Sequence, residues 1–166
     1  AAAQQIALAQ SGAADPWMIA AVLQGVGDHA GKVLEGALSR QHLHIGGGFI
    51  ESLFGIIGEQ RDPKATEYAL GVLSAESTPA TLSKGGIKAF VRGLRRTGTP
   101  LAKVDTEGKL AAVFSKAAAM AVDVRVSEAT KLDAIELLAL ATKDQAGAAL
   151  RACLNAAKFA CIQQAA

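Results

Sequence analysis

The segment with the most side chains capable of chemistry is "QHLHIGGGF", which contains His42, His44 and the glycines Gly46–Gly48. A His-x-His pair can bind a metal ion when both rings face the same way, as they do on a strand. No third ligand lies nearby in the sequence, and His29 is the only other histidine. The three glycines before a helix could also cradle a phosphate, but their spacing fits neither known glycine-rich motif. The alternative is a helix end followed by a glycine-rich turn. We therefore expect no metal site and no cofactor.

The most one-sided charge lies in "SKGGIKAFVRGLRRTG", where basic residues follow a helical spacing of i, i+4, i+8 and i+11/12. Most of them should share one face of a helix over residues 84–96: Lys84, Lys88, Arg92, Arg95 and Arg96. This face could bind phosphates, an acidic protein or anionic lipid. It could equally be a solvated surface, with its last two arginines favourably placed at the negative end of the helix. Nucleic-acid binding usually adds stacking aromatics, and the sole Trp and sole Tyr lie elsewhere in the sequence.

No arrangement of side chains predicts catalysis. Asp133 and Glu136 form an i, i+3 pair on an otherwise polar helix face, and the other carboxylates are scattered. The serines have no histidine and acid in a recognisable pattern, and the G-x-S-x-G motif is absent. Cys153 and Cys161 lie in apolar helical surroundings, where they fit small core residues better than a disulfide or a ligand pair. We expect a protein that is not an enzyme.

The bulk composition predicts helices as the elements that position these residues. The 166 residues are 51% apolar, 19% charged and only 4% aromatic, with Ala and Leu throughout. This mixture suits closely packed helices better than sheets, which favour β-branched and aromatic residues. The net charge of +2 is too small to imply a polyanion partner, and no apolar run is long enough to predict a membrane span.

Two segments of the sequence have nearly the same helical pattern. "DHAGKVLEGALS" (28–39) and "DQAGAALRACLN" (144–155) both place apolar residues at i, i+3, i+4, i+7 and i+8. We expect Asp28 and Asp144 to act as N-caps. Further helices are expected at residues 15–26, 47–60, 62–74, 84–96, 106–122 and 128–141, with the longest loop at residues 97–108. Two of these helices should present apolar stripes, which are Phe49, Ile50, Leu53, Phe54, Ile56 and Ile57 in residues 47–60, and Ile87, Phe90, Val91 and Leu94, facing inward, in residues 84–96. Two of the expected helices start with Asp-Pro, at Asp15 and Asp62.

Helices joined by short links should form antiparallel neighbours, and degenerate repeats of 30 to 47 residues are typical of stacked helix pairs. The predicted fold is therefore all-α, an α-solenoid of stacked antiparallel helix pairs (HEAT/armadillo-like). A globular helical bundle with a chance repeat is the alternative. Glycines inside the expected helices are tolerable if helices cross closely at those points: Gly36, Gly55, Gly71 and Gly93. Trp17 is expected to pack as a wedge between repeats.

The Asp-Pro start, the apolar pair and the capped second helix resemble HEAT-type repeats across most of the chain. More narrowly, "DPWMIAAVLQGVGDHAGKVLEGAL" with "FIESLFGIIGEQRDPKATEYALGVL" is similar to the helical-repeat segment of large exported planctomycete-type dehydrogenase/cytochrome c proteins. That resemblance implies a connector or docking surface between redox domains, and a periplasmic or exported location. The haem-attachment signature Cys-x-x-Cys-His is absent from the sequence.

We expect residues 1–166 to form a single helical-repeat domain, a fragment of a larger protein. The start lacks an initiating Met and the end stops within an apolar pattern. The expected function is a non-catalytic scaffold or protein-interaction segment, whose partners are neighbouring domains of the parent chain or other proteins. The alternative is a helical repeat that binds nucleic acid or another polyanion through the basic face of residues 84–96. A second alternative, a repeat-type enzyme, predicts a groove with buried carboxylates. The apolar faces at both ends should make the isolated chain self-associate.

Overall fold

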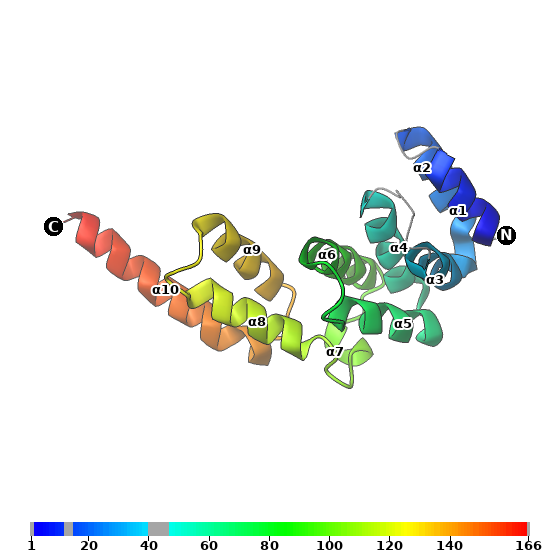
Figure 1. The fold of residues 1–166 in the computed structure, drawn as a ribbon. Helices are drawn as coiled ribbons and strands as arrows, with labels where there is room; N and C mark the ends of the chain where they lie inside the picture. Colours follow the sequence, from blue (N-terminus) through cyan, green and yellow to red (C-terminus); the bar gives the residue numbers. More distant parts are fainter. Residues whose placement is uncertain (1, 12–14, 40–46, 166) are drawn as a thin grey trace. The chain divides into compact units, whose positions relative to one another are not determined.

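A computed structural model describes residues 2–11, 15–39 and 47–165, and all secondary structure in these ranges is helical (Figure 1). The all-α prediction is confirmed for this part of the chain, in which no strand occurs. The helices are α1 (Ala2–Ser11), α2 (Pro16–Val26), the short 3-10 helix η1 (Gly27–His29), α3 (Ala30–Ser39), α4 (Gly47–Gln60), α5 (Pro63–Ser74), α6 (Ala80–Arg96), α7 (Leu101–Val104), α8 (Ala111–Val122), α9 (Glu128–Leu138) and α10 (Lys143–Ala165).

The chain forms two compact units, Ala1–Val104 and Asp105–Ala166. The first contains α1 to α7 and the second contains α8 to α10. The single domain expected over residues 1–166 thus contains two bodies, each with its own buried apolar residues.

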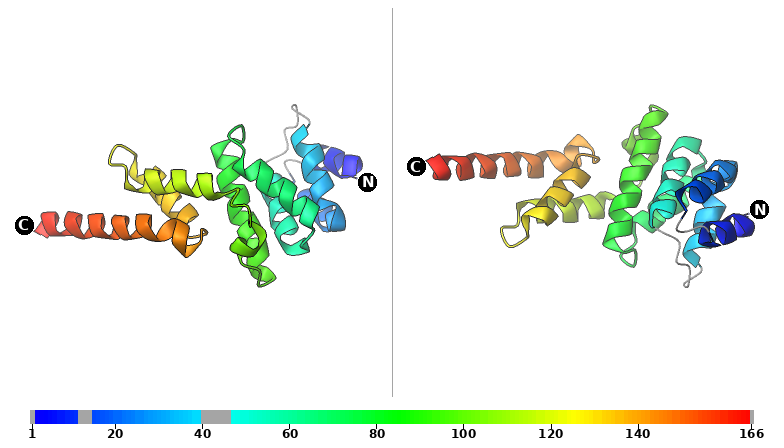
Figure 2. Two further views of the ribbon diagram at one scale, coloured as in Figure 1. Left: turned by 90° about the horizontal axis from the view of Figure 1, so that it is seen from below. Right: turned by 90° about the horizontal axis from the view of Figure 1, so that it is seen from above.

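Helices of the first unit contact both their neighbours in sequence and the helices two places along (Figure 2). Neighbouring contacts join α1 with α2, α3 with α4, and α5 with both α4 and α6. Contacts between helices two places apart join α1, α3 and α5 in one series and α2, α4 and α6 in another. Each helix between the ends of these series therefore buries residues on more than one side, which explains why few charges occur near the middle of α4.

The most extensive helix contact, between α4 and α6, is a close approach of two backbones. A Cβ added at Gly93 would collide with the carbonyl oxygen of Gly55 and would lie 3.1 Å from its carbonyl carbon. A Cβ added at Gly58 would collide with the carbonyl oxygen of Phe90 and would lie 3.1 Å from the amide nitrogen of Leu94. We call this contact the glycine seam, consisting of Gly55, Gly58 and Gly93. The close crossing that would make glycines tolerable inside these helices is therefore present where Gly93 meets the backbone of Gly55.

The other two helical glycines named from the sequence behave differently. Gly36 of α3 does lie at a close approach, because an added Cβ would be 2.7 Å from Cδ1 of Ile6 on α1. Gly71 of α5 has no neighbour within 4 Å of the added Cβ. No close crossing therefore occurs at Gly71, and its cost in helix propensity is not offset by packing.

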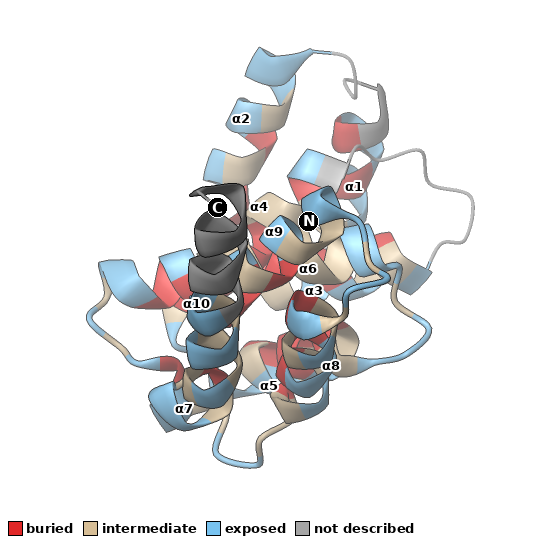
Figure 3. Ribbon diagram, turned by 90° about the vertical axis from the view of Figure 1, so that its left-hand side faces the viewer, coloured by how far each residue is buried: buried red, intermediate tan, exposed pale blue. Residues whose placement is uncertain are grey.

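The core of the first unit consists of the predicted apolar stripes (Figure 3). On α6 the four residues expected to face inward, Ile87, Phe90, Val91 and Leu94, are all buried. On α4, Phe49, Leu53, Phe54 and Ile57 are buried, and Ile50 and Ile56 are half-buried. Among the described residues no polar or charged side chain is buried, so the core is held by apolar packing alone.

Both Asp-Pro helix starts are confirmed. Asp15 accepts a hydrogen bond from the amide of Trp17 (2.9 Å), and Asp62 accepts one from the amide of Lys64 (3.0 Å), with proline at the first helical position in each case. The two helices nevertheless have different places in the contact pattern. The α2 helix contacts α1 and α4, whereas α5 belongs to the series of α1 and α3. The 47-residue spacing of the Asp-Pro starts therefore does not bring them to matching positions.

The predictions that Asp28 and Asp144 are N-caps are wrong. Asp28 lies within η1, which runs directly into α3. Asp144 lies in the first turn of α10, whose start is capped by Thr142 and Gln145. The Thr142 amide donates to Oε1 of Gln145 (3.2 Å), and the Gln145 amide donates to Oγ1 of Thr142 (3.4 Å). This reciprocal pair is a capping box.

The repeated apolar stripe is buried in one copy and only partly in the other. In α3, Ala30, Val33, Leu34 and Ala37 are buried by contacts with α1, α4 and α5. In the second unit, α10 packs on α8 and α9, and of its stripe only Ala146 is buried. Ala149, Leu150 and Cys153 are half-buried and Leu154 is 64% exposed. Similar sequences thus pack differently because α3 has helices on more sides.

Two helix boundaries also differ from the expectation. The α6 helix begins at Ala80, four residues before the expected Lys84, and α8 begins at Ala111 rather than at Thr106. The expected loop over residues 97–108 contains the one-turn helix α7. Gly98 ends α6 with φ of 68°, and the amide of Thr99 donates to the carbonyl of Leu94 (2.9 Å), which is a Schellman C-cap.

Candidate functional surface

The five basic residues of α6 lie on the side of the helix opposite its buried residues. Arg92, Arg95 and Arg96 are exposed, and Lys84 and Lys88 are half-buried. The helix contacts α4 and α5 through its apolar side. The predicted basic residues therefore lie on one accessible face of α6. That this face binds a ligand stays a prediction.

Acidic side chains of α4 flank this face at both ends. Glu59 accepts a hydrogen bond from Nη1 of Arg96 at 2.6 Å, with the two side chains 37% and 67% exposed. At the other end, the carboxylate of Glu51 lies where a Cβ on Gly85 would be. An exposed ion pair of this kind contributes about 0–1 kcal/mol, so its main effect is on charge. Lys84 and Lys88 also have interaction partners. Within the described residues, Arg92 and Arg95 are the members of the basic face that have none.

Arg61 was not predicted from the sequence and belongs to the same end of α6. It has a left-handed backbone conformation with φ of 57°, and its Nη2 donates to the carbonyl oxygen of Thr97 at 2.7 Å. A guanidinium here satisfies a carbonyl just past the helix end and complements the negative end of the helix dipole. Its proximity to Arg95 and Arg96 depends on the connection between α4 and α5, which no local pattern reveals.

The His-x-His pair considered as a metal site lies outside the residues that the structure describes. His42 and His44 do not belong to the described residues, and His29 is exposed on η1. In the described part of the chain, no group of three or more His, Cys, Asp or Glu side chains could hold a metal ion.

Cys153 is half-buried, and its Sγ lies 3.6 Å from the carbonyl oxygen of Ala121 on α8, a contact that fits a small packing residue.

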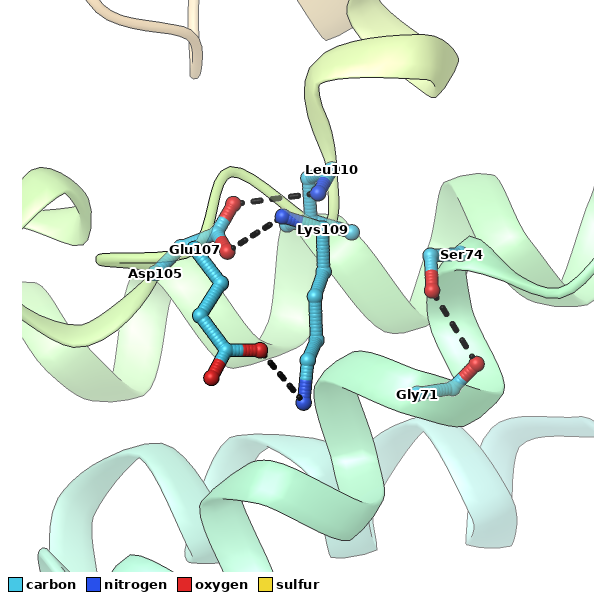
Figure 4. Close-up of polar contacts among 6 residues, drawn as sticks. All are labelled: Gly71, Ser74, Asp105, Glu107, Lys109 and Leu110. Atoms are coloured by element: carbon cyan, nitrogen blue, oxygen red, sulfur yellow. Dashed lines mark hydrogen bonds and ion pairs between the residues drawn. The ribbon is translucent and has the colours of Figure 1, made fainter.

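Half-buried carboxylates stabilise turns in the second unit. Oδ1 of Asp105 accepts from the amide of Lys109 (2.7 Å) and Oδ2 accepts from the amide of Leu110 (3.0 Å), while Lys109 pairs with Glu107 at 3.3 Å (Figure 4). These bonds fix the turn that leads into α8. They also explain why α8 starts later than its apolar pattern suggested, since residues 105–110 form the turn instead of the first helical residues.

Asp123 has the same structural role in the turn between α8 and α9. Arg125 donates to it from the guanidinium (2.9 and 3.1 Å) and from the backbone amide (2.9 Å). These bonds hold the pKa of Asp123 below its ordinary value, and the side-chain bonds from Arg125 have a larger effect than the backbone bond. A lowered carboxyl pKa contributes stability above the pKa of the unfolded chain, and that contribution is lost as the pH falls through the folded value.

Tyr68 of α5 is the sole tyrosine and carries a perturbed pKa. Burial, and secondly the charge of Glu35 on α3, raise the pKa of Tyr68 above its ordinary value of 10.0. Because the raised pKa favours the neutral phenol, its contribution to stability is present below the ordinary pKa and is lost as the pH rises through the folded value.

We expect a spectrophotometric titration of tyrosinate to give a higher midpoint in the folded protein than in denaturant. The substitution Glu35→Gln should move that midpoint part of the way back, because it removes the smaller cause and leaves burial intact. Glu76→Gln, in the turn after α5, is the control and should leave the midpoint unchanged. Identical midpoints in the folded and unfolded protein would show that the phenol is neither buried nor close to the charge of Glu35.

The sole tryptophan is not the expected packing wedge between repeats. Trp17 is 86% exposed at the start of α2. Its indole follows the N-cap Asp15 and Pro16, which fix the helix start, and it lies largely in solvent. The apolar pattern of α2 did not reveal this, because the helix has two apolar faces and only the one with Val22 and Val26 is buried.

Comparison with models of protein families, with curated proteins and with solved structures finds no match to this chain. In the described residues, no helix combines the length and apolar character that crossing a membrane requires.

Proposed function

We propose that the chain is a helical-repeat scaffold, built of stacked antiparallel helix pairs, that binds or spaces other protein domains. The observation that carries the proposal is the alternation of contacts in the first unit. Pairs α1/α2, α3/α4 and α5/α6 are connected through α1, α3 and α5 on one side and through α2, α4 and α6 on the other. A repeat stack has this nearest-neighbour pattern, and such stacks use extended surfaces for binding.

The distribution of charge supports the same proposal. Every described charged side chain is exposed or half-buried, and the half-buried Glu59, Asp105 and Asp123 already have structural partners. The residues available for recognition therefore lie along helix surfaces. The resemblance to HEAT-type segments of exported dehydrogenase-like proteins implies a narrower form of the proposal, in which these surfaces join redox domains of a larger exported protein.

Native-state hydrogen exchange of the full chain tests the stacked architecture. In a stack, each pair is stabilised by its neighbours, so the terminal pair α1/α2 should exchange at lower free energy than α3 to α6. A single globular bundle would instead protect all the helices of the first unit to a common level. That result would remove the repeat architecture on which the scaffold function depends.

A polyanion-binding repeat is the second candidate, and Arg92 and Arg95 are the residues that favour it. We expect no measurable association with duplex DNA, single-stranded RNA or heparin, because Glu59 and Glu51 reduce the positive charge around the face. Fluorescence anisotropy at low salt, repeated over a salt series, measures this. Binding that weakens with salt and is lost in Arg92→Glu/Arg95→Glu would replace the scaffold proposal with the polyanion one.

A further inference from the structure

The C-terminal end of α6 and the residue after α4 bring four arginines together. Arg92, Arg95 and Arg96 follow the i, i+3, i+4 spacing of neighbours on one helix face, and all three are exposed. Arg61 is also exposed, and it lies at the same end of α6 because its Nη2 donates to the carbonyl oxygen of Thr97 at 2.7 Å. We call these four arginines the arginine cluster.

The surroundings of the cluster carry more positive charge than the chain as a whole. Residues 59–64 and 92–96 contain five basic and two acidic side chains, a local charge of +3 against +2 for the complete sequence. Both carboxylates are already engaged, Glu59 with Arg96 at 2.6 Å and Asp62 with a backbone amide at the start of α5. The other two arginines of α6 have no partner within the described residues.

Two members of the cluster are held in place by the fold. Arg61 has φ of 57°, in the left-handed region that favours glycine, and its guanidinium is anchored on the carbonyl of Thr97. The guanidinium of Arg96 is anchored by Glu59. Each anchor uses one nitrogen of a group with several N–H donors, so donors remain for a second acceptor. Side chains that are already ordered lose less entropy when a ligand binds.

The chemistry and the extent of the cluster indicate which ligand it fits. Guanidinium groups bind carboxylates and phosphates through paired hydrogen bonds, so the ligand must be anionic. The distance from Arg92 to Arg96 along the helix axis is only about 6 Å, which matches about two or three carboxylates on one turn of a protein segment. A nucleic acid or heparin is a continuous row of charges, and along α6 it would also meet Glu51 beside Gly85. The cluster contains no aromatic side chain on which bases could stack.

We propose that the arginine cluster docks an acidic segment of a partner protein, whose Asp or Glu side chains are spaced three or four residues apart on one helix face. The carboxylates bind Arg92 and Arg95, and Arg61 and Arg96 contribute their remaining donors beside them. Exposed contacts of this kind are individually weak, so the docking is weak and sensitive to salt.

The proposal rests on the proposed scaffold function, because it names the chemistry of the partner that the scaffold binds. The two can fail separately. If a partner protein binds equally well to a chain that lacks the charges of the cluster, the docking site is removed and the scaffold function remains.

The test uses the full chain and a model peptide. The probe is a capped, alanine-based helical peptide with glutamate at i, i+3, i+4 and i+7, and the control peptide has glutamine at the same positions. Titration into isotope-labelled protein at low salt, followed by amide chemical shifts, measures the affinity and locates the site. We expect a dissociation constant of about 0.1–1 mM that rises with salt, and shifts confined to amides near the cluster. The glutamine peptide should cause no shifts.

Variants separate the cluster from the net charge of the protein. Arg92→Gln/Arg95→Gln should raise the dissociation constant of the glutamate peptide at least about fivefold. Lys116→Gln/Arg151→Gln removes the same charge from exposed positions on α8 and α10, and this matched control should bind like the wild type. Arg61→Gly suits the left-handed backbone, so it should keep the fold and weaken binding at least about twofold.

The proposal is overturned if the glutamate peptide causes no shifts, or if the control pair of substitutions weakens it as much as the arginine pair. It is also overturned if Arg61→Gly leaves binding unchanged, because Arg61 would then only cap the end of α6. If single-stranded RNA or heparin shifts the same amides at lower concentration than the peptide, the occupant is a polyanion and the proposal is again overturned. A circular dichroism spectrum equal to that of the wild type shows that each variant is folded.

Discussion

Replacing Gly93 by alanine should lower the free energy of unfolding by about 2 kcal/mol or more, although alanine is the better helix former. The added methyl group would collide with the carbonyl oxygen of Gly55, a backbone atom that cannot rotate away. The helices α4 and α6 would have to separate, and the buried contacts of Phe90 and Leu94 would loosen with them. Urea unfolding followed by circular dichroism measures the change.

Gly71→Ala is the matched control, because it makes the same chemical change inside a helix of the same unit. At Gly71 the new methyl group meets nothing within 4 Å, so only helix propensity acts. We expect this variant to gain about 0.5–1 kcal/mol. Two glycine-to-alanine substitutions should thus have opposite signs. Equal stability of Gly93→Ala and the wild type would show that the glycine seam is not a close backbone contact.

The second large effect is expected at Phe54 of α4, which is fully buried and whose ring lies against Gly86 of α6. Phe54→Ala should cost about 3–5 kcal/mol, through the lost transfer free energy and the cavity left behind. The same denaturant titration measures it. Phe54→Leu keeps most of the volume and should cost markedly less. A loss below about 1 kcal/mol for Phe54→Ala would contradict the described packing.

A double-mutant cycle tests whether the Phe54 ring is in contact with Gly86 of α6. A Cβ at Gly86 would lie 2.9 Å from Cδ2 of Phe54, so Gly86→Ala should destabilise the wild type. In the Phe54→Ala background the same change should cost less, because the ring is gone, although Cδ2 of Leu73 remains 2.6 Å from the added Cβ. Additive effects would show that the ring and Gly86 are not in contact.

The features that followed from the sequence are those that depend on local periodicity. Ile87, Phe90, Val91 and Leu94 were placed inward from their spacing alone, and Asp62 with Pro63 marked a helix start. These predictions succeed because amphipathic spacing and N-cap chemistry act within one or two turns.

The features that did not follow depend on which helices become neighbours. The stripe of α10 has the same spacing as that of α3, yet Leu154 is exposed because fewer helices surround it. Asp28 has the residue type of an N-cap but lies in a 3-10 turn that continues into α3. Trp17 was expected inside and is outside, since α2 has apolar residues on both faces.

The basic face shows the same division. Its five residues could be placed on one side of a helix from their spacing, but their partners could not. Glu59 and Arg61 come from α4 and the turn after it, and they approach α6 only because the glycine seam brings the two helices together. Charge counted along one helix therefore overstates the charge that a ligand would meet.

The glycine seam also has a mechanical consequence. Where two backbones are in contact, neither helix can tilt or slide without breaking that contact. We therefore expect α4 and α6 to respond to force as a single rigid unit. The contact between α1 and α3 involves the end of a longer side chain, Cδ1 of Ile6 against Gly36, which yields more easily. A partner that pulls on the first unit should therefore bend it by opening the contact between α1 and α3, and the elastic response of the protein should differ between its two sides.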